Sequence, residues 1–398
     1  MSRVYVEEIA ENLYMLRVDD YDTKYFEALW NIPEGITYNA YVLTTDEGAV
    51  LFDTWKQSYA DLFLETLRRV VDPRDIKYAV VHHMEPDHSG SLPRLLDVNS
   101  DITVVGHPIA RGLIVAFYGR EPRFRAVKDL EVLDVGDEKL RFIHIPWLHW
   151  PDTIATFLEN RKVLLSSDAF GGYGAPPSIY DDDPGVVERY MPMVRKYLAT
   201  VVGHYREYIV KNIDKIASLG IDLEVVAPAH GLVWRRRPKT IVEFYRRLGN
   251  AEPEKGKIVV IYSSMYGFAQ KTVNALVTEV LPQSTRVKTF GFTDVEQASI
   301  GDILGESIDA QAIVLCISNY EGRLFPTMEH VVKVLGQKVN AEKPIVVVNT
   351  YGWGKISEEY VRSLLAGTRL KLVDIVYIRG SPRAEDIERL RQAISKLL

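Results

Sequence analysis

The sequence predicts two folded parts, an α+β part over residues 1–250 and a doubly wound α/β part over residues 255–398. The length of 398 residues suits two or three domains. A polar stretch with Gly and Pro, residues 249–257, lies between a helix-like run and a strongly apolar run and marks the boundary. After it, short β-branched runs alternate with helical runs, which favours a parallel sheet covered by helices on both faces.

The first part mixes many short strands with fewer helices, the pattern of an α+β domain. Its expected strands are residues 39–43, 49–52, 78–81, 103–106, 140–145, 162–166 and 223–227. Its expected helices are residues 59–70 and 184–219.

The second part alternates regularly between strand and helix. Its expected strands are residues 257–262, 286–290, 312–317, 344–348 and 371–376, and its expected helices are residues 269–280, 328–336, 358–366 and 384–397. Cys316 falls inside one of these strands, and we interpret it as a small core residue.

The composition is that of an ordinary globular protein, with 47% hydrophobic and 26% charged residues. A net charge of −6 argues against nucleic acid and anionic membranes as partners. One cysteine excludes an intrachain disulfide and any all-thiolate metal site built by this chain alone, and it fits a reducing compartment. No apolar run approaches the ~20 residues of a membrane span. We therefore expect a cytoplasmic protein.

The segment 81–90, VHHMEPDHSG, is the most informative motif. Four side chains that can bind a metal, His83, Glu85, Asp87 and His88, fall within six residues directly after a predicted strand. Extended geometry would put positions 83, 85 and 87 on one side and 88 on the other, so one ion could hardly collect all four. Two ions sharing the segment could, each with an imidazole and a carboxylate.

Further metal-binding side chains follow three other predicted strands. His149 comes after strand 140–145, Asp168 after strand 162–166, and His230 after strand 223–227. The two oxygens of a carboxylate such as Asp168 can bridge two cations. Four imidazoles and three carboxylates without sulfur suit iron or manganese as well as zinc.

Three loops of the second part follow predicted strands at the edge where open α/β sheets bind ligands. The first loop feeds a helix N-terminus and offers backbone N–H groups to a phosphate, and no Gly-x-Gly-x-x-Gly follows a strand, so a mononucleotide is favoured. Its candidate residues are Ser263, Ser264, Met265, Tyr266, Gly267 and Phe268. The other two loops offer glycines and aromatic side chains to a flat ring. Their candidates are Ser318, Asn319, Tyr320, Glu321, Gly322, Asn349, Thr350, Tyr351, Gly352, Trp353 and Gly354.

The motifs HMEPDH (83–88), LHWP (148–151), SD (167–168) and PAHG (228–231) resemble those of the flavodiiron proteins, also called A-type flavoproteins. The resemblance extends over nearly the whole chain. It implies an N-terminal metallo-β-lactamase-like αββα sandwich and a C-terminal flavodoxin-like domain that binds FMN. In this family a glutamate, here Glu85, replaces the second histidine of the hydrolase motif.

The resemblance also implies roles for single residues. One iron would be held by His83, Glu85 and His149, the other by Asp87, His88 and His230, and Asp168 would bridge them. In some family members the residue matching His88 turns away from the metal. Tyr197 resembles a tyrosine near the irons, and a tyrosine on a helix face is the alternative. The phosphate loop departs from the family, because Phe268 and Ala269 follow Gly267 where many members carry a hydroxyl side chain. We therefore expect backbone amides, Ser263 and Ser264 to bind the phosphate.

The implied activity is reduction of dioxygen to water or of nitric oxide to nitrous oxide. Reduced FMN and two ferrous ions carry two electrons each, which together match the four that dioxygen needs. A head-to-tail homodimer, or a dimer of dimers, would bring the flavin of one subunit to the irons of its partner. Because the chain has no Cys-x-x-Cys pair, electrons must come from outside, from a rubredoxin-like protein or a reduced deazaflavin coenzyme.

Two alternatives stay open at this point. One is a two-zinc hydrolase of the metallo-β-lactamase type with an appended flavodoxin domain, in which zinc-bound hydroxide is the nucleophile. The other is an electron-carrying flavoprotein with a vestigial metal site. Glu85 and the second domain argue against the first, and the intact set of seven ligands argues against the second.

Overall fold

The computed structural model describes residues 3–398 and divides the chain into two compact units. The first unit runs to Tyr197 and continues over Glu207–Gly249. The second unit comprises Leu198–Arg206 and Asn250–Leu398. A short segment near the middle of the chain is therefore built into the second unit.

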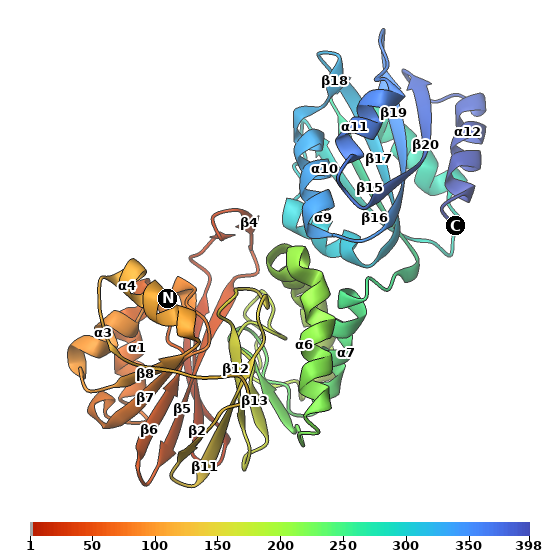
Figure 1. Cartoon of the computed structure of the whole chain (residues 1–398). Coiled ribbons are helices and arrows are strands. Elements are labelled where there is room, and N and C mark those ends of the chain that lie inside the picture. Colours follow the sequence, from red (N-terminus) through yellow and green to blue (C-terminus); the bar gives the residue numbers. More distant parts are fainter. Residues whose placement is uncertain (1–2) are drawn as a thin grey trace. The chain divides into compact units, whose positions relative to one another are not determined.

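Two β-sheets form the first unit (Figure 1). The larger sheet has the order β1 (Arg3–Ala10), β2 (Leu13–Asp20), β5 (Ile36–Thr45), β6 (Gly48–Phe52), β7 (Ile76–Val81), β8 (Thr103–Gly106) and β9 (Arg123–Ala126). The smaller sheet has the order β10 (Val132–Val135), β11 (Glu138–His144), β12 (Ile154–Leu158), β13 (Val163–Leu165) and β14 (Val225–Ala227). A hairpin of β3 (Tyr25–Phe26) and β4 (Trp30–Asn31) stands apart from both.

The two sheets enclose one core. Buried side chains of the larger sheet, among them Met15 and Phe52, cluster with Phe142 and Leu158 of the smaller sheet. Each such side chain contributes about 1.5–3 kcal/mol by leaving water. Helices α1 (Ala60–Leu67), α3 (Leu92–Val98) and α4 (Pro108–Tyr118) lie beside the larger sheet, and α6 (Arg206–Ser218) and α7 (Pro238–Gly249) lie beside the smaller one (Figure 1). The expected αββα sandwich is confirmed.

The single helix expected over residues 184–219 is interrupted. Helix α5 (Pro184–Tyr197) contains Pro192 and passes into a π-helical turn, Leu198–Val202, and a short 3₁₀ turn before α6 begins. The interruption is the segment that belongs to the second unit. A Cβ atom at Gly203 would collide with the carbonyl oxygen of Lys338, so glycine permits a close backbone approach there.

Polar contacts tie this segment to the second unit. The Lys338 ammonium donates to the carbonyl oxygen of Thr200 at 2.6 Å. The guanidinium of Arg206 donates to the carbonyl oxygen of Asn340 at 2.6 Å. Both contacts hold the segment Leu198–Arg206 against the residues around the end of helix α10 (Pro326–Lys338) within the second unit.

The second unit contains one parallel sheet with a short antiparallel addition. Its order is β16 (Arg286–Thr293), β15 (Glu254–Ser264), β17 (Ala310–Tyr320), β19 (Lys343–Tyr351) and β20 (Leu370–Arg379), with β18 (Arg323–Leu324) paired to β17. Numbered along the chain, the parallel strands follow the order 2-1-3-4-5 of flavodoxin. The expected flavodoxin-like fold is confirmed.

Helices cover both faces of this sheet. Helices α8 (Phe268–Ala275) and α12 (Ala384–Ser395) pack on one face, and α9 (Ile300–Ile308), α10 (Pro326–Lys338) and α11 (Glu358–Leu365) pack on the other. The helix expected over residues 269–280 ends early, in a π-helical turn, Leu276–Val280. Cys316 is fully buried in β17, and burial raises the pKa of its thiol to about 12, as suits a core residue.

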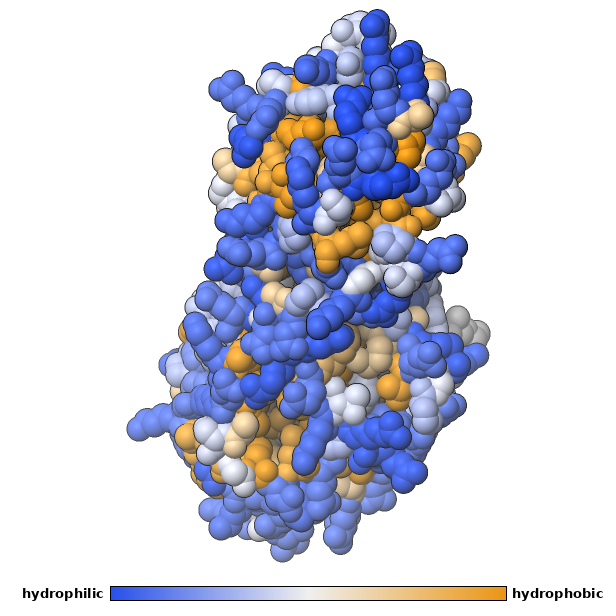
Figure 2. All heavy atoms as spheres, turned by 90° about the vertical axis from the view of Figure 1, so that its right-hand side faces the viewer, coloured by the Kyte–Doolittle hydropathy of each residue, from blue (hydrophilic) through white to orange (hydrophobic). Residues whose placement is uncertain are grey.

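Hydrophilic residues dominate the face of the molecule shown in Figure 2, and hydrophobic residues appear there in separate patches. Within residues 3–398, no helix is both long enough and apolar enough to cross a bilayer.

Candidate functional site

The seven side chains expected to bind metal converge at one end of the αββα sandwich. They follow the carboxyl ends of β7, β11, β13 and β14. The hydrogen-bonded sheet holds these strand ends in place, and so positions the side chains that follow them. They form three overlapping groups in which all ligand atoms lie within 4.8 Å of one another. The groups are His83, Glu85, His149 and Asp168; His83, Asp87 and His88; and His88, Asp168 and His230.

The local geometry of the first motif differs from the expectation. The segment is not extended throughout, because Pro86 begins a short helix, α2 (Pro86–Ser89), at the position where proline is favoured. The Ser89 hydroxyl donates to the carbonyl oxygen of Met84 at 2.9 Å and ties this turn to the strand end. The expectation that position 88 points away from positions 83, 85 and 87 is therefore wrong.

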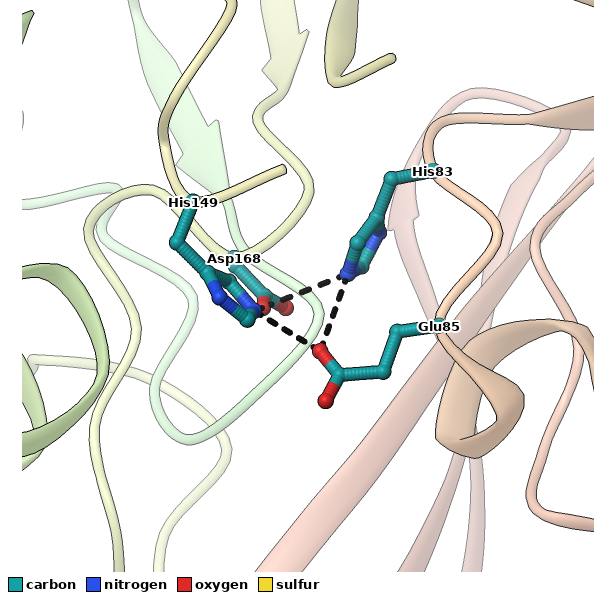
Figure 3. Close-up of side chains that lie close together, drawn as sticks. All are labelled: His83, Glu85, His149 and Asp168. Carbon is teal, nitrogen blue, oxygen red and sulfur yellow. Dashed lines mark hydrogen bonds and ion pairs between the residues drawn. The ribbon is translucent and has the colours of Figure 1, made fainter. Parts of the chain in front are cut away.

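His83, Glu85, His149 and Asp168 point toward one another from three separate segments (Figure 3). The Nε2 atom of His149 lies 2.7 Å from Oε2 of Glu85 and 3.0 Å from Oδ2 of Asp168. The Nε2 atom of His83 lies 3.4 Å from each of the same two oxygens. Two nitrogens and two oxygens thus surround one point.

The other oxygen of Asp168 faces a second set. Its Oδ1 atom lies 2.9 Å from Nε2 of His88 and 3.4 Å from Nε2 of His230. Asp87 Oδ2 lies 3.3 Å and 3.5 Å from the same two nitrogens. Asp168 therefore presents one oxygen to each set, which is the geometry of a bridging carboxylate.

Two carboxylates of this cluster, Asp87 and Asp168, lack the hydrogen bonds that their burial requires. Among residues 3–398, no donor is aligned for a hydrogen bond to either carboxylate oxygen of Asp87 or of Asp168. The Nε2 atoms of His88 and His230 also lie only 3.1 Å apart. Buried carboxylates are costly unless they are paired or bind a cation, so the arrangement fits metal ions.

Groups outside the cluster orient its imidazoles. Nδ1 of His230 lies 2.6 Å from the carbonyl oxygen of Thr37 on β5, and a carbonyl can only accept, so Nδ1 carries the proton. The lone pair of Nε2 then faces the cluster. Nδ1 of His83 lies 3.1 Å from the hydroxyl of Ser167. Such contacts fix the tautomer and the ring orientation of metal ligands.

Burial and close charges move the pKa values in opposite directions. Burial disfavours charged His149, but the carboxylates of Glu85 and Asp168 outweigh it and raise its pKa to about 10. Burial raises the pKa of Asp87 to about 7. Burial and the neighbouring His88 lower the pKa of His230 to about 4. Strongly perturbed groups of both signs within one cluster are typical of a functional site.

Tyr197 ends helix α5 beside this cluster and is fully buried. The centre of its ring lies 5.6 Å from that of His230. Burial, reinforced by the charge of Asp168, raises the pKa of the Tyr197 hydroxyl well above its usual range. The hydroxyl therefore stays protonated at neutral pH and can donate.

The second unit has a cavity of about 490 Å³ where β15, β17 and β19 end, a volume within the range of cofactor sites. The expected residues that line it are Ser264, Met265, Tyr266, Phe268, Ser318, Asn319, Glu321, Gly322, Thr350, Tyr351, Gly352, Trp353 and Gly354. Trp353 is 100% exposed and Tyr266 is 83% exposed, so each offers a bare aromatic face at the cavity.

Two expected cofactor contacts support the walls of the cavity instead. Ser263 is buried, and its hydroxyl oxygen accepts a hydrogen bond from the backbone N–H of Ser318 at 3.2 Å. Asn349 is also buried, and its side-chain oxygen accepts from the backbone N–H of Ile356 at 3.1 Å. Neither residue lines the cavity.

Gly267 and Tyr320 also lie outside the lining. Gly267 adopts a φ of 83° and precedes the first residue of α8, where its positive φ suits glycine. Tyr320 packs edge-on against Phe325, with 6.0 Å between the ring centres. Conversely, Ala269, Lys355 and Gly380 line the cavity although they are not among the expected cofactor contacts. Lys355 directly follows the predicted loop 349–354, so a wider reading of that loop could have found it.

Comparison with known proteins supports these observations. A family model described as ODP family beta lactamase matches residues 36–231. A nitric oxide reductase of Moorella thermoacetica is 27% identical over 96% of this chain and 95% of its own length. A rubredoxin-oxygen oxidoreductase of Megalodesulfovibrio gigas is 26% identical over 98% of both chains.

Among solved structures, a variant of the flavo di-iron protein from Thermotoga maritima is 37% identical, with a TM-score of 0.94, over 100% of this chain and 98% of that chain. Sequence and fold thus agree over the whole of this chain and nearly all of that chain. The chain therefore belongs to the flavodiiron protein family, whose cofactors are FMN and a pair of iron ions.

Proposed function

We propose that this protein reduces dioxygen to water, and nitric oxide to nitrous oxide as a second reaction, with electrons passed from FMN to two iron ions. Membership of the family makes it an oxidoreductase of nitric oxide or dioxygen, and the choice of reaction is the proposal. The observation that carries the two-iron chemistry is the buried convergence of four imidazoles and three carboxylates, two of which, Asp87 and Asp168, have oxygens without a hydrogen-bond donor in the described chain.

The proposed ligand set divides the seven residues between two ions. His83, Glu85 and His149 would hold one iron, and Asp87, His88 and His230 would hold the other. Asp168 would bridge them, which is supported by its two oxygens facing the two sets. Imidazole and carboxylate ligands without thiolate suit iron.

Bound iron would supply the redox chemistry and bound FMN the electrons. The chain's own residues prepare the site for the reacting gas. The Thr37 carbonyl and the Ser167 hydroxyl hold two imidazoles with Nε2 turned inward. Tyr197 keeps its proton next to the cluster, and we assign its hydroxyl the role of donating a hydrogen bond or a proton to the substrate oxygen.

The cavity of the second unit is the proposed FMN site. The phosphate would lie at the loop that includes Ser264 and leads into α8, where backbone N–H groups and the helix dipole favour an anion. The ring would lie against the two loops that carry Glu321 and Trp353. An exposed tryptophan at the cavity supports this assignment, because a flat ring would cover it.

A head-to-tail homodimer, or a dimer of dimers, is the proposed assembly. Exposed aromatic side chains lie near both sites, with Trp353 100% exposed at the cavity and Phe117 43% exposed in the first unit. The Phe117 ring lies 6.4 Å from that of Trp150, which in turn lies 6.3 Å from His149. Clustered exposed apolar surface is typical of interfaces. Light scattering of the purified protein should give at least twice the chain mass of 45.3 kDa, and an active monomer would contradict this assembly.

The proposed electron source is an external carrier in the cytoplasm, either a rubredoxin-like protein or a reduced deazaflavin coenzyme. The name of the Megalodesulfovibrio gigas relative supports the first. Stopped-flow oxidation of each reduced carrier by the protein, under anaerobic conditions, would choose between them.

The two-zinc hydrolase is the main competitor and makes a different prediction about metal content. Protein purified anaerobically should contain about two iron ions per chain. Two zinc ions per chain together with hydrolysis of a β-lactam or thioester would refute the proposal.

The decisive activity test compares the two gases under one reductant. Dioxygen uptake should consume four electrons per molecule and release no hydrogen peroxide, since O₂ + 4 e⁻ + 4 H⁺ gives 2 H₂O. Nitric oxide consumption is measured anaerobically in the same buffer. Consumption of neither gas by protein loaded with iron and FMN would overturn the proposed function.

A further inference from the structure

We propose that Lys355 stabilises the negative charge of reduced FMN and so raises the midpoint potential of the bound flavin. The inference rests on the proposed FMN site and adds a residue to it. Lys355 lies in the chain directly after the loop of glycines and aromatics that lines the cavity, and it lines the cavity itself.

The position of the ammonium group is defined by an aromatic platform. The Nζ atom of Lys355 lies 4.5 Å from the centre of the Tyr377 ring on β20. Among residues 3–398, no carboxylate lies within ion-pair distance of it. A cation held over a ring and left without a counter-ion is available to a negatively charged ligand.

The loop that carries Lys355 is clamped from neighbouring segments. The guanidinium of Arg379 donates to the carbonyl oxygen of Gly352 at 3.0 Å, and the side-chain amide of Asn319 donates to that of Gly354. On the other side, the backbone N–H of Ile356 donates to the side chain of Asn349 at 3.1 Å. Lys355 is therefore held at the cavity before any ligand binds, which lowers the entropic cost of its contact.

Only two charged side chains, Lys355 and Glu321, line this cavity in the described chain. Reduction follows FMN + 2 e⁻ + H⁺ → FMNH⁻, with electrons from the external carrier and the proton from water, so the ring gains one negative charge. A nearby ammonium binds this product more tightly than the neutral ring of oxidised FMN. Glu321 acts in the opposite direction. The two side chains therefore predict shifts of opposite sign.

The test is an anaerobic spectroelectrochemical titration of the FMN-loaded protein. Lys355→Gln should lower the ratio of affinities for reduced and oxidised FMN about tenfold, which for a two-electron couple is about 30 mV in midpoint potential. Glu321→Gln should raise the potential, and Lys355→Arg should preserve it. Lys371→Gln is the matched control, because Lys371 lies on the same unit outside the cavity and is 62% exposed.

A parallel measurement of the dissociation constant of oxidised FMN, by fluorescence of the released flavin, separates the alternatives. An unchanged potential in Lys355→Gln with FMN still bound would overturn the inference alone. Weaker binding of oxidised FMN with an unchanged potential would assign Lys355 to the phosphate and would also overturn it. A wild-type protein that binds no FMN would instead overturn the proposed function.

Discussion

The metal cluster and the flavin cavity differ in how completely protein side chains enclose them. His83, His88, Asp168 and His230 are each 0% exposed and already point at one another, whereas Trp353 at the cavity is 100% exposed. The first site is built by side chains at strand ends, where the sheet hydrogen bonds fix each backbone position. The second is formed by loops, and a bound ligand would cover the loop side chains that are now exposed.

This difference predicts how each site responds to change. Removal of one metal ligand leaves other buried charges without a partner, so the damage should be large and local. Removal of one wall of the cavity leaves the other loops in place, so the damage should be graded. The expected effects below run from the largest to the smallest.

Glu85→Ala should produce the largest effect. Its carboxylate lies 2.7 Å from His149 and 3.4 Å from His83, so both imidazoles lose a neighbour. Iron content should fall from about two to one or fewer per chain, and turnover should fall more than about 100-fold, beyond the loss typical of an outer partner. Flavin absorbance should remain. Iron analysis and the oxygen electrode measure both, with exposed Glu65→Ala as control. Full activity of Glu85→Ala would refute the ligand assignment.

Removal of iron by a chelator should sharpen the contrast between the sites. The carboxylates of Asp87 and Asp168 would then lie buried without a cation, so the thermal midpoint of the first unit should fall. The FMN content should not change. Calorimetry before and after anaerobic addition of ferrous iron measures the shift, and loss of FMN in step with iron would contradict the separation of the two sites.

The second unit also contains a buried charged group, Lys343, whose burial should lower the free energy of unfolding when the lysine is protonated. It is 2% exposed at the start of β19, its Nζ donates to the carbonyl oxygen of Ala310 at 2.6 Å, and burial lowers its pKa to about 8. Lys257 and Arg206 lower that pKa further, and Asp309 opposes them.

The unfolded lysine has a higher pKa, about 10.4, so the unfolded state binds more protons between pH 8 and 10.4 and stability rises with pH there. Relative to Lys343→Met, the wild type should gain about 3 kcal/mol at most between pH 7.5 and 10.5. Urea unfolding at several pH values measures the difference. A difference that does not vary with pH would show that Lys343 titrates normally.

Ser167→Ala should weaken the metal site without removing a ligand. The Ser167 hydroxyl lies 3.1 Å from Nδ1 of His83, and partners of this kind contribute roughly 10- to 100-fold in metal affinity. Iron loss to a competing chelator should accelerate, while exposed Ser100→Ala should match the wild type. Equal iron retention in both variants would show that the backbone alone fixes His83.

Trp353→Ala should give the smallest effect of the series. An aromatic contact is worth about a two- to tenfold change in affinity, and the neighbouring loops remain. The dissociation constant of FMN should rise by that factor with iron content unchanged. Val295→Ala is a control on the same unit, because Val295 is 96% exposed and does not line the cavity. A complete loss of FMN would show that the cavity depends on a single wall.

The sequence predicts the second unit well because its strands are buried on both faces and appear as continuous apolar runs. Each predicted strand lies within the observed one. Helix α9 is absent from the prediction, since two glycines and one serine weaken its helical signal. The edge strand β1 is also absent, because charged and partly exposed residues hide its alternation.

The metal ligands could be predicted because each follows a strand and carries distinctive chemistry. Their partners could not, since Thr37 acts through a backbone carbonyl that lies 193 positions from His230. The cavity lining was predicted less precisely. Adjacent residues of a strand point to opposite faces, so of the two expected serines, Ser263 and Ser264, only Ser264 lines the cavity.

The nine-residue turn at Leu198–Arg206 has a practical consequence for anyone who wishes to study the halves apart. Severing the chain at the linker near residue 250 would leave this turn on the first fragment, while Lys338 and Asn340, which hold it, would depart with the second. Separate expression of the first unit would therefore need a designed linker between α5 and α6 in place of this turn. The reason is that a segment near the middle of the sequence, between two parts of the first unit, folds as part of the second unit.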